Sequence, residues 1–147
     1  MKTTALIKKL NPSVRVPEYK TPGSSGLDLE AFIEKDVILK PKTSALIPTG
    51  LSIAVEEGLE IQIRPRSGLA AKNQITVLNT PGTVDSDYRG ELKIILINLG
   101  NDDFVIKKHD RIAQMVICPI VKAEFKITHD LPKTLRGIEG FGSTGKN

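Results

Sequence analysis

Short apolar-rich runs, several of them with alternating apolar and polar residues, recur along this chain between glycine and proline residues. In LEIQIR, for example, Leu59, Ile61 and Ile63 alternate with polar residues, which is the two-residue period of a strand with one buried face. Strand-like segments recur at residues 4–10, 25–31, 36–40, 43–55, 59–65, 75–79, 91–98, 103–108, 111–120 and 123–127. Because no helical spacing separates them, we predict an all-β fold, a jelly-roll-like antiparallel sandwich or barrel.

One segment departs from this pattern. We predict a short helix over SGLAAKN, residues 67–73, with Ser67 as its N-cap. Arg64 and Arg66 directly precede it, so two guanidinium groups and the helix amides could face one anion. A turn with a capped helix and two solvated arginines explains the same residues equally well.

The chain has 147 residues, the size of one ordinary domain. We predict a β-domain over residues 1–135 and a flexible arm over residues 136–147, because RGIEGFGSTGKN is too rich in glycine to pack as a strand or helix. A frayed end is the ordinary interpretation of such a tail. The arm nevertheless carries a cation, a stacking face and two hydroxyl groups, as a lid over a ligand would. These groups belong to Arg136, Phe141, Ser143 and Thr144.

The net charge and its distribution exclude few kinds of binding partner. The formal net charge is +4, from 21 Lys and Arg against 17 Asp and Glu, and the basic residues are scattered singly. This balance suits a small phosphate ligand as well as nucleic acid. The apolar stretch of the N-terminus is too short for a signal peptide, and no segment is long and apolar enough to span a bilayer. We therefore expect a cytoplasmic protein with no membrane partner.

The stretch LNTPGTVDSDYRG concentrates polar chemistry in a turn between two predicted strands. Asp85 and Asp87 place two carboxylates together where one would suffice for a turn. Asp85 could orient and deprotonate a water molecule, and Tyr88 could pack against a sugar or base. Asn79 presents a donor and an acceptor that could read a pyrimidine edge. The alternative is an ordinary hairpin turn whose polar side chains have no function.

A second carboxylate candidate, Asp28, lies in SSGLDLEA, where Leu27 and Leu29 alternate with Asp28 and Glu30. A half-buried strand with a solvated acidic face explains these residues without any function. Only their combination with other motifs makes them candidates for a site.

Five stretches together resemble the signature motifs of the trimeric dUTPases, which split dUTP into dUMP and pyrophosphate. They are SSGLDLEA, RPRSGLA, LNTPGTVDSDYRG, HDRIAQMVI and RGIEGFGSTG, in this order over residues 24–145. The resemblance implies that the enzyme lowers dUTP, supplies dUMP for thymidylate synthesis, uses Mg²⁺, and forms a homotrimer whose active sites are shared between subunits. It implies dUTP, and not nucleic acid, as the partner.

The resemblance also assigns roles to individual residues. Asp85 matches the catalytic aspartate that orients the attacking water, Tyr88 the residue under the deoxyribose, and Asn79 the residue that reads uracil. Asp28 matches a carboxylate that holds water on the magnesium. The remaining substrate-binding positions, on the phosphates and in the arm that closes over the nucleotide, are Arg66, Ser67, Gly68, Gln114, Arg136, Phe141, Gly142, Ser143 and Thr144.

One position departs from the family pattern, and two alternatives stay open. The fourth motif usually begins with glycine, whereas this chain has His109, so we expect a slightly different turn with a surface histidine. The homologous dCTP deaminase requires a glutamate on the strand after the third motif, where this chain has Ile95. A non-catalytic β-sandwich that binds nucleotide through basic loops is the other alternative, but it leaves DSDY unexplained.

Overall fold

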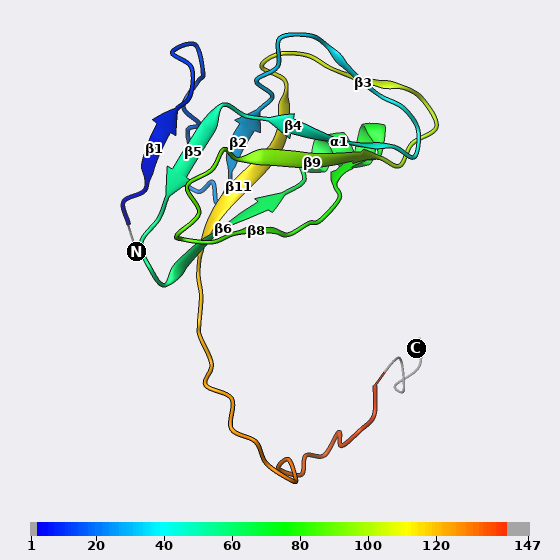
Figure 1. The fold of residues 1–147 in the computed structure, drawn as a ribbon. Helices are drawn as coiled ribbons and strands as arrows, with labels where there is room; N and C mark the ends of the chain where they lie inside the picture. The colour runs from blue at the N-terminus through cyan, green and yellow to red at the C-terminus, as the bar shows by residue number, and fades with distance from the viewer. Residues whose placement is uncertain (1–2, 141–147) are drawn as a thin grey trace.

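The computed structural model describes residues 3–140 and shows a β-rich body followed by an extended C-terminal segment (Figure 1). All strand pairs are antiparallel, and the described chain contains one short helix, which confirms the predicted all-β class. In chain order, the elements are β1 (Leu6–Lys9), β2 (Leu27–Glu30), β3 (Val37–Leu39), β4 (Ser44–Pro48), β5 (Leu51–Ala54), β6 (Leu59–Arg64), α1 (Ser67–Asn73), β7 (Ile75–Val77), β8 (Gly82–Val84), β9 (Lys93–Asn98), β10 (Phe104–Ile106) and β11 (Arg111–Pro119).

The strands form four small sheets, and most pairs join segments that are distant in the sequence. The largest sheet has the order β2-β11-β6-β8, and a second has the order β4-β9-β7. Two further pairs, β1 with β5 and β3 with β10, complete the body. No helix of the described residues is long and apolar enough to cross a membrane.

The core is aliphatic, as the alternating pattern predicts. In β9, Ile94 and Leu96 are completely buried, while Ile95 between them is partly exposed. The polar side chain of Asn98 ends the same buried row. Its amide donates to the carbonyls of Leu39 and Asp102 at 2.8 Å each, which satisfies the group inside the core.

Three local predictions were wrong. Residues 123–127 form no strand, because no other described segment lies beside them as a partner strand, and they extend away from the body (Figure 1). The helix spans the predicted residues 67–73, but Arg66 in an extended conformation occupies the N-cap position instead of Ser67. His109 is only partly on the surface, with 26% of its side chain exposed, and it adopts a positive φ of 70°.

Gly50 allows the sharp turn between β4 and β5. Its φ is +70°, and an added Cβ would lie 2.5 Å from Cγ2 of Val14. We expect Gly50→Ala to lower the free energy of unfolding by roughly 2–4 kcal/mol, through left-handed strain and overpacking together. Urea denaturation followed by circular dichroism measures this.

Gly58 provides the matched control, since its φ is +88° but an added Cβ would meet nothing within 4 Å. Gly58→Ala therefore tests strain alone, and we expect a loss of about 1 kcal/mol. Equal losses in the two variants would contradict the role of the contact with Val14.

Candidate active site

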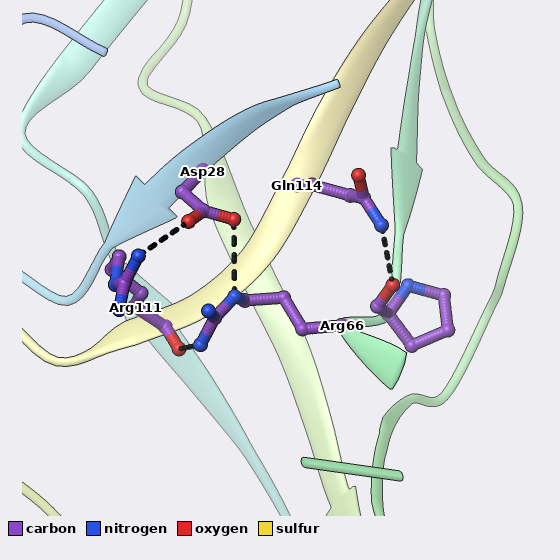
Figure 2. A network of polar contacts seen from close by, with 5 residues as sticks. Asp28, Arg66, Arg111 and Gln114 are labelled. Carbon is purple, nitrogen blue, oxygen red and sulfur yellow. Dashed lines mark hydrogen bonds and ion pairs between the residues drawn. The ribbon is translucent and has the colours of Figure 1, made fainter. Parts of the chain in front are cut away.

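Asp28 lies at the centre of a network of charged groups at one end of the large sheet (Figure 2). Arg66 donates from Nε to Oδ1 of Asp28 at 3.0 Å, and Arg111 donates from Nη1 to Oδ2 at 3.1 Å. Arg66 also donates from Nη1 to the carbonyl oxygen of Arg111 at 2.9 Å. The Asp28 carboxylate is about four-fifths buried, so solvent screens these charge-assisted bonds less than it would on an open surface.

Backbone pairing brings this network together. Asp28 on β2 lies opposite Gln114 on β11, which in turn lies opposite Arg64 on β6. The amide of Gln114 donates to the carbonyl of Pro65 at 3.0 Å and so fixes the chain just before Arg66. A Cβ added at Gly26 would overlap the side-chain oxygen of Gln114, so a larger residue there would displace this amide.

Arg64 does not join this network, although the sequence suggested that it could share an anion with Arg66. Its guanidinium donates to the side-chain oxygen of Gln62 at 2.6 Å and 3.0 Å, and so is engaged along its own strand. Arg66 therefore approaches Asp28 without it.

The carboxylate-rich turn after β8 is closed by its own backbone. The Tyr88 amide donates to the carbonyl of Asp85 at 3.1 Å, and the Arg89 guanidinium donates to the carbonyl of Ser86 at 2.7 Å. The Tyr88 hydroxyl donates to the Glu91 carbonyl at 3.1 Å, which orients the ring. Asp85 is exposed in the single chain and lines a hollow of about 610 Å³.

This chain alone does not bring the turn and the Asp28 network together. Val84, just before Asp85, lies opposite Ile61, three residues along β6 from Arg64. That offset corresponds to about 10 Å along the strands. In addition, β11 and β6 separate β2 from β8. Asp85 and Asp28 therefore belong to two separate groups of candidate residues.

The other predicted residues are distributed around these groups. Ser67 and Gly68 are exposed at the start of α1, next to Arg66, and Asn79 is exposed in the loop before β8. Arg136 is exposed, and its Nε donates to the carbonyl of Glu139 at 2.9 Å. The predicted arm residues Phe141, Gly142, Ser143 and Thr144 lie outside the described residues.

Sequence reasoning assigned no role to Arg111, although it bonds directly to Asp28. The available signal was a lone cation at the start of a strand that is otherwise largely apolar, RIAQMVICP. That signal says nothing about register, and only the pairing of β11 with β2 reveals the partner of Arg111.

The donor groups around Asp28 limit how a Mg²⁺ ion could be held there. Residues 3–140 contain no cluster of three or more His, Cys, Asp and Glu side chains that could enclose an ion. Each Asp28 oxygen already accepts a bond from a guanidinium group, but a carboxylate has lone pairs left for further donors. The residue therefore fits a contact through metal-bound water better than direct coordination.

The antiparallel β-fold, with guanidinium groups at a sheet end and carboxylates in an exposed turn, indicates a protein that binds a small phosphorylated molecule. Comparison with known proteins identifies the family within this class. The dUTPase family matches residues 13–145, and the chain belongs to this family.

Similar proteins cover nearly the whole chain. The deoxyuridine 5'-triphosphate nucleotidohydrolase of Treponema denticola is 60% identical over 137 residues, which are 93% of this chain and 95% of the relative. That of Nautilia profundicola is 57% identical over 140 residues, 95% of this chain and 97% of the relative. The solved structure of the Staphylococcus bacteriophage 80alpha dUTPase with dUPNHPP has a TM-score of 0.84 at 28% identity, and the match covers 98% of this chain and 99% of that one.

Proposed function

We propose that this protein hydrolyses dUTP to dUMP and pyrophosphate, which lowers dUTP and supplies dUMP for thymidylate synthesis. The observation that carries this function is the family match over residues 13–145, which contains all five motifs. The chemistry suits the residues, because phosphoryl transfer requires positioning and charge neutralisation more than covalent catalysis.

Asp85 is the proposed catalytic residue. Its carboxylate would accept a hydrogen bond from a water molecule, orient it in line with the bond between the α-phosphorus and the leaving pyrophosphate, and take its proton. The closed turn from Asp85 to Tyr88 supports this role, because it fixes the backbone on which the carboxylate stands. The exposure of Asp85 leaves it open to a bound nucleotide.

The phosphates are proposed to bind next to the Asp28 network. Arg66, Ser67 and Gly68 lie together where β6 passes into α1, and Gln114 is fixed beside them through Pro65. Arg66 supplies positive charge, and Ser67 and Gly68 supply hydroxyl and backbone donors. Asp28 would hold water molecules of a Mg²⁺ ion. When bound, the ion would neutralise charge on the triphosphate.

Selection of uracil and deoxyribose is assigned to the hairpin of the third motif. The Tyr88 ring, which its bond to Glu91 orients, would pack under the sugar and leave no room for a 2′-hydroxyl. The Asn79 amide would pair with the uracil edge. Arg136 and the arm residues after it would close over the bound nucleotide, so we keep residues 136–147 as a separate arm in this proposal.

A homotrimer is the proposed assembly, with each active site shared between subunits, in the cytoplasm and without nucleic acid. The separation of Asp85 from Asp28 supports shared sites, because a second copy could bring its turn to the network of the first. The segment after Pro119 supports assembly independently. Its apolar side chains are fully exposed in the single chain, among them Phe125 at 93% and Ile127 at 103%.

Changing Phe125 and Ile127 together to serine is expected to dissociate the assembly, since both side chains would otherwise be buried against another subunit. Light scattering after gel filtration should give the trimer mass for the unmodified chain and the mass of a single chain for the double variant. Lys126→Ser, between them in the same exposed segment, should stay trimeric. A monomeric unmodified chain would contradict the proposed assembly.

Pyrophosphate release from dUTP with Mg²⁺, measured beside UTP, dTTP and dCTP, tests the function. We expect rapid release from dUTP alone. Ammonia from dCTP would favour the deaminase, although Ile95 offers no acid–base group for that reaction. Binding without turnover of any nucleotide would favour a non-catalytic module.

A further inference from the structure

His109 has a backbone conformation that residues with a side chain rarely adopt. Its φ of 70° lies in the left-handed region, where a residue with a Cβ is less stable than glycine. The conformation therefore has a compensating cause in the contacts of this residue, and such an outlier is a starting point for a functional hypothesis.

The contacts of His109 fasten it to β2. Its amide donates to the carbonyl of Ala31 at 2.8 Å, and its Nδ1 lies 3.0 Å from Oε2 of Glu30. A carboxylate only accepts hydrogen bonds, so Nδ1 carries the proton and donates it. The imidazole also meets the ring of Phe32 edge to face, with 6.2 Å between centroids. Glu30 is thus engaged by a half-buried partner.

The contact between His109 and Glu30 affects Arg111, because Glu30 is also within reach of the Arg111 side chain. Arg111 lies opposite Glu30 in the β2–β11 register, beside a register shift between Arg111 and Ala113, and oppositely charged residues so placed are within reach of an ion pair. Its guanidinium instead donates to Asp28, the next carboxylate on the same face of β2. No ion pair between Arg111 and Glu30 exists among the described residues. Asp28, Glu30, His109 and Arg111 all line one cavity of about 640 Å³, so both carboxylates are within the same space.

We propose that His109 is a positioning residue: by binding Glu30, it keeps Arg111 on Asp28 and thereby holds Arg66 in place. Arg15 also approaches Glu30, but at 3.5 Å and with 64% of its side chain exposed, so it holds the carboxylate less firmly. If Arg111 turned to Glu30, Asp28 would lose one of its two guanidinium partners. This inference rests on the proposed roles of Asp28 and Arg66 in phosphate binding.

His109→Gly is the direct test, because glycine keeps the positive φ without strain and removes only the imidazole. We expect the KM for dUTP to rise roughly tenfold while kcat falls less than about threefold, since a charge-assisted bond to Asp28 is lost and ground-state phosphate binding weakens. Circular dichroism should show the fold unchanged.

Rescue separates positioning from a merely structural role. In the double variant with His109→Gly and Glu30→Gln, Arg111 has no competing carboxylate, so the KM should return to within about twofold of the unmodified enzyme. Glu30→Gln alone should change the KM little. His109→Asn should also preserve the KM, because asparagine tolerates positive φ and can donate to Glu30.

A crystal structure of the His109→Gly variant gives a readout besides activity, with the Arg111 guanidinium expected on Glu30. An unchanged KM, a double variant as impaired as His109→Gly, or Arg111 still on Asp28 would each overturn the proposal. Arg66→Ala is the control for the site itself. If it loses activity while His109→Gly does not, the proposed function stands and this inference fails.

Discussion

Asp85→Asn is expected to lower kcat for dUTP by about 10³-fold while nucleotide affinity changes little, because the amide keeps the size of the side chain but takes no proton from water. The turn should survive the change, since its hydrogen bonds come from the Tyr88 amide and the Arg89 guanidinium. Steady-state pyrophosphate release measures kcat, and calorimetry with a non-hydrolysable dUTP analogue measures binding.

Asp87→Asn is the matched control for this prediction, because Asp87 lies in the same turn and is also exposed. We expect its kcat within about threefold of the unmodified enzyme, as for other surface charges away from the reacting atoms. Near-normal turnover by Asp85→Asn, or equal losses in the two variants, would refute the assignment of the catalytic base.

Removing the Arg66 guanidinium is the second change with a large expected effect. Arg66→Ala should lower kcat/KM by roughly 10²–10³-fold, because it takes a positive charge from the phosphates and leaves Asp28 with one partner fewer. Arg66→Lys should recover little of the loss. A lysine ammonium cannot reproduce the planar guanidinium that bonds Asp28 and the Arg111 carbonyl at once.

Arg64→Ala controls for the general loss of a cation near the sheet end. Arg64 donates to Gln62 on its own strand and has no bond to Asp28, so we expect kcat/KM to change less than about threefold. If Arg64→Ala and Arg66→Ala are equally impaired, long-range charge and not the Asp28 network explains the effect.

Local patterns predicted most of the fold. Alternation of apolar residues identified β6, a short apolar run identified β9, and the boundaries of α1 were correct, because burial of side chains and helix propensity depend on nearby residues. Residues 123–127 have strand-like alternation but no partner strand among residues 3–140. Pattern alone cannot tell whether a partner strand exists.

The candidate site, like the fold, was predictable only where the signal is local. Motif residues such as Asp28 and Asp85 could be named from the sequence, but the partners that orient Asp28 could not. Arg111 reaches Asp28 only because β11 lies beside β2, and His109 reaches Glu30 for the same reason. Pairing between distant segments depends on the whole fold and leaves no local signature.

The pairing of β2 with β11 also determines when the site can form. Asp28 and Arg111 are 83 residues apart in the chain, and nearly all of the β-rich body lies between them. Closing such long loops precedes the gain from the contacts, so β-proteins of this kind fold slowly, on a timescale of about milliseconds to seconds. On the ribosome, β2 emerges long before β11, which is its only neighbouring strand among the described residues and which supplies Arg111. The network around Asp28 therefore forms late in folding. Its formation requires that β2 has already paired with β11.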